Sequence, residues 1–360
     1  MSRRILLAAG GTGGHMFPAQ ALAEILQKQG WEIALMTDGR GVKHAGQIPT
    51  KHVVEVQAAT ISPKHPIRAI SGIWKLKNGV ITAQKFIKKW RPDIVVGFGG
   101  YPAYPALSAA QKLGTPMVLH EQNAVLGRVN RLFAARAEAV VSGFDMLEKL
   151  PANTQWRTLG NPLRAGILKA SARAYKPPTQ KINVLIIGGS LGARLLSETV
   201  PQAVALLPDD LCTRLNIVQQ TRQESLHLAN TVYEQAGVKA LCSPFFSDIE
   251  AHLAAAHYVI ARAGASSVSE IAVMGLPALF VPLAIAMDDH QSLNALPLKN
   301  LNAADILPES EFTPDKLKSI LMERLNDSSW LETASHKART AAKPEAAIDL
   351  AELVSTIATR

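Results

Sequence analysis

The sequence predicts an α/β protein made of two Rossmann-like domains, each built around a parallel sheet. A short apolar run at Arg3–Ala9 ends in the glycine loop Gly10–His15, and apolar residues at helical spacing follow it. The same order returns at Ile182–Ile187 and Gly188–Ala193, where INVLIIGGSLGA repeats RILLAAGGTGGH. A chain of 360 residues is also long for a single hydrophobic core.

The first half alternates strand and helix patterns, which is typical of a doubly wound α/β domain. The expected strands are Arg3–Ala9, Glu32–Thr37, His52–Val56, Asp93–Gly97, Pro116–Leu119, Ala139–Ser142 and Arg157–Leu159. The expected helices are Pro18–Gln29, part of Lys64–Arg91, Pro105–Leu113 and Arg128–Ala135.

A linker is predicted at Ala165–Lys181, because this stretch lacks a strand pattern and contains Pro177-Pro178. The strands expected after it are Ile182–Ile187, Leu215–Gln219, Lys239–Cys242, Tyr258–Ala261 and Ala278–Val281. Helices are expected from the second glycine loop to about Leu207, from a Ser266-Ser267 cap to about Met274, and at Trp330–Ala342 and Glu345–Thr359. The terminal helix is placed to cross back onto the first domain.

The composition is that of an ordinary globular protein, with 19% charged and 48% apolar residues. Cys212 and Cys242 lack the spacing of a zinc site, and two cysteines fit a reducing compartment better than a disulfide framework. The apolar run in MSRRILLAAGG is too short for a signal peptide, and none reaches the roughly 18 residues of a membrane span. We therefore expect neither an export signal nor a membrane-spanning helix.

Positive charge is concentrated in the first part of the chain. Residues 1–160 contain 20 Lys and Arg against 9 Asp and Glu, whereas the remainder contains 18 against 20. Such asymmetry indicates an anionic partner, either nucleic acid or an anionic membrane surface. Within Lys64–Arg91, basic residues alternate with apolar ones, so the segment is either an amphipathic helix packed on the sheet or, at Ile73–Lys77, a membrane-facing one.

The glycine loops indicate phosphate binding but fit neither of the common nucleotide fingerprints. The first loop lacks the third glycine of a dinucleotide site, and neither loop ends in the Gly-Lys-Ser/Thr of a Walker sequence. A single loop of this kind is often only a tight turn. Several on one two-domain chain indicate a nucleotide, and the helix start after Arg262–Ala265 would favour its phosphates.

Three polar positions allow both a structural and a functional interpretation. Glu270 lies three residues after Ser267, as in a capping box, but a carboxylate there can also accept the hydroxyls of a ribose. His15 is either a local hydrogen-bond partner or a general base, with His120 and Glu121 as competing candidates. Asp288-Asp289 gives little support for a metal site, because adjacent side chains usually point in different directions.

Seven segments occur in the order found in the MurG family, which the chain resembles over nearly its whole length. They are GGTGGH (Gly10–His15), GGYP (Gly99–Pro102), HEQN (His120–Asn123), GNPLR (Gly160–Arg164), GGSLGA (Gly188–Ala193), GASSVSE (Gly264–Glu270) and DHQSLNA (Asp289–Ala295).

The resemblance implies a GT-B fold and an inverting hexosyltransferase that needs no metal or other cofactor. It implies transfer of GlcNAc from UDP-GlcNAc to the C4 hydroxyl of the muramoyl sugar of lipid I, undecaprenyl-pyrophosphoryl-MurNAc-pentapeptide, giving lipid II. It implies a peripheral protein on the cytoplasmic face of the inner membrane, serving peptidoglycan synthesis and through it cell shape and division. The anionic membrane surface would be the partner of the basic half, and no nucleic-acid-binding motif is present.

The resemblance also implies two domains with separate tasks. Residues 1–163 with 343–360 would bind the acceptor and the membrane, and residues 164–342 would bind UDP-GlcNAc. His15 is the first choice for the catalytic base and Glu121 the second.

Substrate-binding roles are implied by motif position. Thr12, Gly13 and Gly14 would face the donor sugar and the acceptor, and Asn123, Arg164 and Ser190 the donor, with Ser190 near its diphosphate. Ala265, Ser266, Ser267, Val268 and Ser269 would hold the diphosphate and nucleoside, Glu270 the ribose, Phe246 the uracil, and His290 and Gln291 the sugar hydroxyls. His290 departs from members that have Gln there.

Two other functions remain compatible with the sequence. A UDP-GlcNAc 2-epimerase would use the same fold and donor without a lipid acceptor. A membrane-docked binding module would bind UDP without turnover, although the intact Gly10–His15 loop argues against it.

Overall fold

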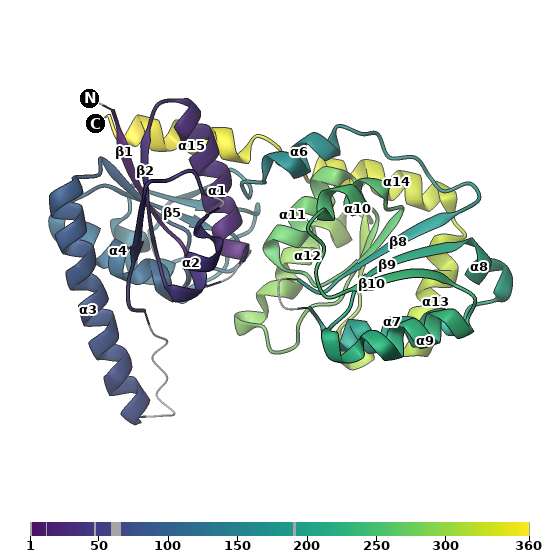
Figure 1. Cartoon of the computed structure of the whole chain (residues 1–360). Coiled ribbons are helices and arrows are strands. Elements are labelled where there is room, and N and C mark those ends of the chain that lie inside the picture. The colour runs from purple at the N-terminus through teal and green to yellow at the C-terminus, as the bar shows by residue number, and fades with distance from the viewer. Residues whose placement is uncertain (1, 12, 47, 59–65, 190–191, 360) are drawn as a thin grey trace. The chain divides into compact units, whose positions relative to one another are not determined.

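The computed structural model describes residues 2–11, 13–46, 48–58, 66–189 and 192–359. The chain forms two compact units (Figure 1). Unit 1 comprises Met1–Arg164 and Lys343–Arg360, and unit 2 comprises Ala165–Ala342. Each contains a parallel sheet covered by helices, which confirms the predicted α/β class with two Rossmann-like domains.

The described part of unit 1 contains a seven-stranded parallel sheet with the order β3-β2-β1-β4-β5-β6-β7. Its central strands are apolar on both faces, as expected for a sheet covered on both sides, and Ile5, Leu6, Leu7 and Ala8 are fully buried. The strands are β1 (Arg4–Ala8), β2 (Glu32–Thr37), β3 (His52–Glu55), β4 (Ile94–Gly97), β5 (Met117–Glu121), β6 (Ala139–Ser142) and β7 (Trp156–Thr158).

The two faces of this sheet carry separate apolar clusters. Ile5 and Leu7 pack in one cluster with α1 and α15, whereas Leu6 and Ala8 pack in the other with α3 and α4. The helical segments are α1 (Gly13–Lys28), α2 (Gly39–Ala45), α3 (Pro66–Trp90), α4 (Gly100–Leu113), α5 (Arg128–Phe133), η1 (Ala134–Arg136) and α15 (Ala346–Ile357). The last helix therefore belongs to the core of unit 1.

Unit 2, over its described residues, contains a six-stranded parallel sheet with the order β10-β9-β8-β11-β12-β13. One apolar cluster joins alternate residues of β8 to α7, α13 and α14. The strands are β8 (Ile182–Ile187), β9 (Leu215–Gln220), β10 (Lys239–Ser243), β11 (Tyr258–Ala261), β12 (Ala278–Phe280) and β13 (Ala304–Ile306).

The helices of unit 2 connect these strands and cover them. The α-helices are α6 (Ala165–Ser171), α7 (Arg194–Ala205), α8 (Asp209–Arg214), α9 (Leu226–Gln235), α10 (Ile249–Ala255), α11 (Ala265–Met274), α12 (His290–Asn300), α13 (Pro314–Leu325) and α14 (Ser328–Thr340). The 3₁₀ segments are η2 (Gln223–Ser225), η3 (Met287–Asp289) and η4 (Glu309–Glu311).

Two local predictions were wrong. The first helix begins at Gly13 instead of Pro18, so Pro18 lies inside it as the sixth residue, where it cannot donate the backbone hydrogen bond of a helix interior. The predicted linker begins with the short helix α6, whose Ile167 is buried. Among the described residues, no helix combines the length and apolarity needed to cross a membrane.

Candidate functional site

The strand order of unit 2 reverses between β8 and β11. These strands are paired in parallel, with Ile187 opposite Ala261 at their carboxyl ends. The chain leaves β8 through Gly188–Ala193 and leaves β11 through Arg262–Gly264, so the two turns lie next to each other. Open α/β sheets bind ligands at such a reversal, outside the carboxyl ends of the strands.

The loop after β8 depends on glycine. A Cβ on Gly188 would lie 2.3 Å from the backbone nitrogen of Ala193, and Gly189 and Gly192 have φ angles of +85° and +68°. The N–H of Gly188 donates to Oε1 of Gln220 at 3.0 Å. The predicted donor residue Ser190 lies outside the described residues.

The predicted serine cap of α11 is wrong. The helix begins at Ala265 with Gly264 as its N-cap, and glycine has no side chain that could accept a hydrogen bond there. The capping-box interpretation of Ser267 and Glu270 is wrong for the same reason, because Ser267 already lies in the first turn. A cap without a side-chain acceptor leaves the first-turn N–H groups oriented for an anion.

The side chains of α11 differ in how accessible they are. Ser266, Ser267 and Ser269 are partly exposed, whereas Ala265 and Val268 are buried. Ala265 and Val268 could therefore contact a ligand only through their backbone atoms. Glu270, in the second turn, has 9% of its surface exposed.

The loop between β12 and α12 is fixed at its base by a buried arginine. Arg262 donates from Nη1 to the carbonyl of Val281 at 3.0 Å and pairs through Nη2 with Glu309. The second carboxylate oxygen of Glu309 accepts from the N–H of Ala284 at 3.0 Å. Sequence reasoning missed this pair, although an arginine between two apolar strands was a visible signal.

His290 and Gln291 open α12 directly after this loop. Oε1 of Gln291 accepts from the N–H of Leu283 at 3.0 Å, which fixes the orientation of its amide and points its NH₂ group away from that bond. Asp288 and Asp289 have φ angles of 59° and 51° and form the entry to the helix. Among the described residues, no group of three His, Cys, Asp or Glu side chains could hold a metal ion.

Phe246 follows β10, two strands away from the reversal. It is half-buried and packs edge-on against His252 of α10, with ring centroids 4.8 Å apart and an interplanar angle of 69°. An aromatic side chain at the carboxyl edge of the sheet can pack against a flat base.

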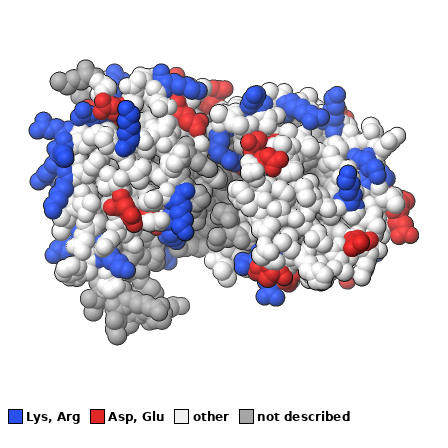
Figure 2. Space-filling view, in the orientation of Figure 1, with Lys and Arg blue, Asp and Glu red and all other residues white. Residues whose placement is uncertain are grey.

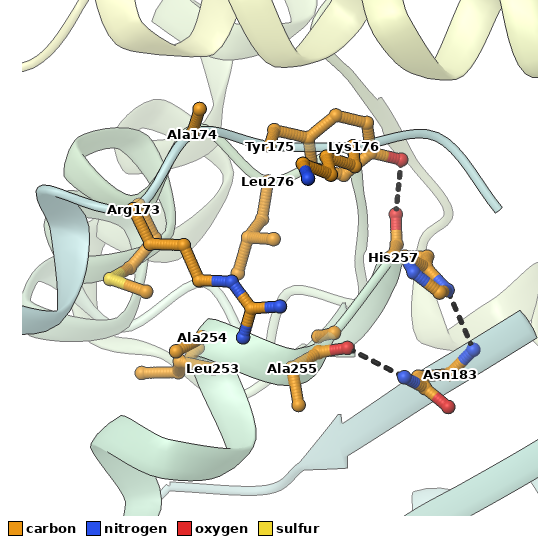
Figure 3. A pocket seen from close by; sticks show the side chains of 12 residues that line it. Arg173, Ala174, Tyr175, Lys176, Asn183, Leu253, Ala254, Ala255, His257 and Leu276 are labelled. Carbon is orange, nitrogen blue, oxygen red and sulfur yellow. Dashed lines mark hydrogen bonds between the residues drawn. The ribbon is translucent and has the colours of Figure 1, made fainter.

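A separate pocket of unit 2 lies at the amino ends of the strands (Figure 3). Its lining includes Arg173, Tyr175, Asn183, His257 and Leu276. Asn183 is near the amino end of β8, and its N–H donates to Nδ1 of His257 at 2.9 Å. The pocket is therefore distinct from the glycine loops at the carboxyl ends.

Unit 1 has its own strand-order reversal, between β1 and β4. The N–H of Phe98 donates to the carbonyl of Ala8 at 2.9 Å, so the loops that follow these strands leave the sheet together. The close approach requires glycine, because a Cβ on Gly10 would lie 2.7 Å from Cβ of Pro102. Thr12 lies outside the described residues, and Gly13 and Gly14 open α1.

His15 lies in the first turn of α1, against the loop after β4. A Cβ on Gly100 would be 3.3 Å from its Nε2 atom. Its Nδ1 atom is 2.9 Å from Oε1 of Gln122, which follows β5. Gln122 was not among the predicted site residues, although it lies inside the HEQN segment.

The other candidate base, Glu121, is 2% exposed and held by amide groups. Its Oε1 accepts from the backbone nitrogen and Nδ2 of Asn123, at 3.2 and 3.1 Å. Its Oε2 accepts from the N–H of Gly127 at 2.8 Å and from Nδ2 of Asn130 at 2.9 Å. This geometry favours a role in fixing the loop after β5 over proton transfer.

The predicted donor contacts Asn123 and Arg164 both belong to unit 1. The side chain of Asn123 is directed to Glu121, and the guanidinium of Arg164 lies over the ring of Phe17 at 4.4 Å from its centroid. Thr12, Gly13 and Gly14 also belong to unit 1, and the other predicted donor residues belong to unit 2.

Comparison with known proteins relates both units to glycosyltransferases. Residues 5–142 match the glycosyltransferase family 28 N-terminal domain and residues 183–350 its C-terminal domain. A Maricaulis maris protein is 50% identical, over 99% of this chain and 98% of its own, and one from Caulobacter vibrioides is 44% identical, over 99% and 100%. Both are named UDP-N-acetylglucosamine–N-acetylmuramyl-(pentapeptide) pyrophosphoryl-undecaprenol N-acetylglucosamine transferase.

Solved structures give the same relationship. The crystal structure of Acinetobacter baumannii MurG matches with a TM-score of 0.79 and 30% identity, over 98% of this chain and 99% of that one. The calicheamicin glycosyltransferase CalG4 shares the fold, with a TM-score of 0.71 at 14% identity, over 100% and 99% of the two chains. These features define a glycosyltransferase fold of the GT-B class. The chain belongs to the MurG family.

Proposed function

We propose that the protein transfers GlcNAc from UDP-GlcNAc to the C4 hydroxyl of the muramoyl sugar of lipid I, forming lipid II for peptidoglycan synthesis. The name shared by relatives of 42–50% identity over nearly the whole chain supports this reaction. The observation that carries the proposal is the adjacency of the carboxyl ends of β8 and β11 at a strand-order reversal, where Gly188 follows one strand and the turn into α11 follows the other. Two helix starts side by side suit a nucleoside diphosphate.

The donor would lie along the carboxyl ends of the strands in the sheet of unit 2. The starts of α7 and α11 would stabilise the diphosphate as it gains negative charge in the transition state, without a metal ion. Glu270 would accept the ribose hydroxyls, Phe246 would lie beside the uracil, and His290 and Gln291 would bind the sugar.

The chemical step would be one in-line displacement at the anomeric carbon, with inversion to a β-linkage. The acceptor hydroxyl attacks as UDP leaves, through an oxocarbenium-like transition state. His15 would take the hydroxyl proton, and the neighbouring Gly10–Gly14 loop would face the acceptor.

Helix α3 would bring unit 1 to an anionic membrane surface. Its buried residues follow a helical period, and its outward residues include Trp74, 67% exposed, and Ile81, 41% exposed, among Lys77, Lys85 and Lys88. Figure 2 shows Lys and Arg side chains gathered along the edge of unit 1 that α3 occupies. No acidic residue occurs from Val56 to Pro92.

Apolar and basic side chains on one helix face are typical of interfacial helices that bind anionic lipid. We place the protein at the cytoplasmic face of the inner membrane as a peripheral protein, where it would serve wall growth, cell shape and division. Nucleic acid is not part of this proposal.

One assay tests the reaction. The protein is incubated with labelled UDP-GlcNAc and a lipid I analogue, with and without a chelator, and we expect label in the lipid product in both cases. Label that appears instead in the 2-epimer of the donor would make the protein an epimerase. UDP binding without transfer would make it a binding module.

A further inference from the structure

A chain of hydrogen bonds runs through the core of unit 1 and ends on His15. Nε2 of His120 is 2.9 Å from the carbonyl oxygen of Gly160. Nδ1 of His120 is 3.1 Å from Nε2 of Gln122, and Oε1 of Gln122 is 2.9 Å from Nδ1 of His15. His120 is fully buried and Gln122 is 2% exposed, so water does not compete for the bonds that His120 makes to Gly160 and Gln122.

The bond between His120 and Gly160 fixes which partner donates in each of these hydrogen bonds. A carbonyl oxygen can only accept, so Nε2 of His120 carries the proton that it donates to Gly160. Burial lowers the pKa of His120 to about 4, so its ring is neutral near pH 7. A neutral imidazole with a protonated Nε2 has its lone pair on Nδ1, which therefore accepts.

The amide of Gln122 then has one possible orientation. Its NH₂ group must face Nδ1 of His120, and the same nitrogen also donates to the carbonyl oxygen of His120 at 3.2 Å. Its Oε1 atom consequently faces His15 and accepts from Nδ1 of that ring. This assignment follows from the partners and not from the shape of the amide, whose two ends look alike.

We propose that Gln122 and His120 are positioning residues that hold His15 as the Nδ1–H tautomer and so leave Nε2 as its proton-accepting atom. The inference rests on the proposed function for what the base does, but the tautomer is a property of the protein alone. When the hydroxyl proton arrives at Nε2, the Nδ1–H bond to Gln122 persists and supports the charged ring. No proton moves along the chain, because His120 stays neutral.

The arrangement also explains the glycine after β4. Nε2 of His15 lies on the side of Gly100, where an added Cβ would come within 3.3 Å of it. Gly100 has a φ of +70°, which a residue with a side chain rarely adopts. The basic atom therefore faces a stretch of backbone that carries no side chain.

Nitrogen-15 NMR of histidine-labelled full-length protein tests the tautomer without any substrate. The two-bond couplings of His15, assigned with His15→Gln, should show a protonated Nδ1 and a pyridine-type Nε2 at neutral pH. In Gln122→Met this pattern should be lost. Protonation of Nδ1 should persist in Gln122→Glu, which keeps an oxygen facing His15, and the whole pattern should persist in the control Gln111→Met on α4.

Two results would overturn the proposal: a protonated Nε2 of His15 in the unchanged protein, or an unchanged tautomer in Gln122→Met. The first measurement needs no variant and so does not depend on how well Gln122→Met folds. In the transferase assay, Gln122→Met should lower kcat on the order of 10²-fold with the KM for UDP-GlcNAc within about twofold. The expected tautomer in a protein without transferase activity would refute the proposed function and leave this inference intact.

Discussion

At the scale of single residues, His15 and Glu121 are the two candidate bases, and the structure treats them differently. The carboxylate of Glu121 is occupied by amide donors from three residues, Asn123 and Gly127 of the loop after β5 and Asn130 of α5. His15 is held through one ring nitrogen, at a loop built from glycines. A base must accept a proton from a substrate, and the geometry gives that freedom to the histidine.

His15→Ala and Glu121→Gln should therefore have opposite effects. The histidine variant should lose turnover on the order of 10²-fold with nearly unchanged UDP affinity and melting temperature. The glutamine variant should lose about 1–3 kcal/mol of unfolding free energy, because its NH₂ group would face another donor, and should keep its turnover per folded molecule. Urea unfolding and the transferase assay measure both. A loss within about threefold for His15→Ala, roughly 0.65 kcal/mol, would remove His15 as the base.

Glu270→Ala should weaken UDP binding at least about tenfold, because a carboxylate that accepts ribose hydroxyls forms charge-assisted hydrogen bonds. Glu270 lies beyond the first turn of α11, so a capping role does not account for a carboxylate at this position. Calorimetric titration with UDP gives the affinity, and Glu250→Ala on α10 is the control. A lower melting temperature with UDP affinity unchanged within twofold would show a purely structural carboxylate.

Which side chains the fold brings together was the least predictable part of the site. Arg262 meets Glu309 across 47 positions of sequence, and His15 meets Gln122 across 107. Local spacing carries no information about such pairs, because they depend on the order of strands in a sheet. Glu270 could be proposed from the sequence because the glycine turn before it is a local signal.

At the scale of elements, the strands were predicted more accurately than the helix starts. Glu32–Thr37, Ala139–Ser142, Ile182–Ile187 and Tyr258–Ala261 were placed to the residue, since buried parallel strands form short apolar runs. The start of α11 was misplaced because Ser266-Ser267 looks like a cap, whereas the tight turn after β11 already begins the helix at Ala265. The chain between the strands of unit 2 folds into several helices with weak patterns, and α8, α9 and α10 were not predicted.

Gly188→Ala should disrupt the loop after β8. The new Cβ would collide with the backbone of Ala193, which cannot move without displacing the start of α7. We expect a loss of about 1–3 kcal/mol in stability and weaker UDP binding. In Gly166→Ala on α6 the Cβ would find ordinary contacts of 3.4 Å or more, so this control should be neutral or slightly stabilising. Wild-type UDP affinity in Gly188→Ala would exclude this loop from the donor site.

The outward face of α3 gives a prediction for membrane binding. Trp74→Ser with Ile81→Ser should lower binding to vesicles that contain anionic lipid by at least about tenfold, because burying each large apolar side chain contributes about 1.5–3 kcal/mol. Added salt should weaken binding further through the lysines. Vesicle flotation measures both effects, with Leu228→Ser, an exposed leucine on α9, as the control. Unchanged flotation of the double variant would remove α3 as the membrane contact.

At the scale of the whole molecule, the two units have separate cores, and α15 belongs to the one that starts the chain. Leu350 and Val354 of this helix are fully buried with Leu22 and Leu26 of α1. In unit 2 the corresponding buried residue is Leu331 of α14, which is also fully buried. Position in the sequence therefore does not show which unit a terminal helix stabilises.

Leu350→Ala should destabilise unit 1 by about 2–5 kcal/mol, as for other buried leucines, and leave unit 2 nearly unchanged. Hydrogen exchange followed by mass spectrometry should show faster exchange in β1 and α1. Leu331→Ala is the matched control and should accelerate exchange in unit 2 instead. Faster exchange confined to unit 2 in Leu350→Ala would contradict the division of the chain at residues 164 and 343.

The return of α15 has a consequence for synthesis on the ribosome. The first sheet emerges early, but the helix that covers α1 is translated only after all of unit 2, from residue 165 to residue 342. At 5–20 residues per second this delay is roughly 10–40 seconds. Unit 2 is contiguous and can fold as soon as it emerges, so the nascent chain exposes the apolar face of α1 throughout that time. A chaperone that recognises apolar helices could therefore bind α1 before α15 has been synthesised and can pack against it.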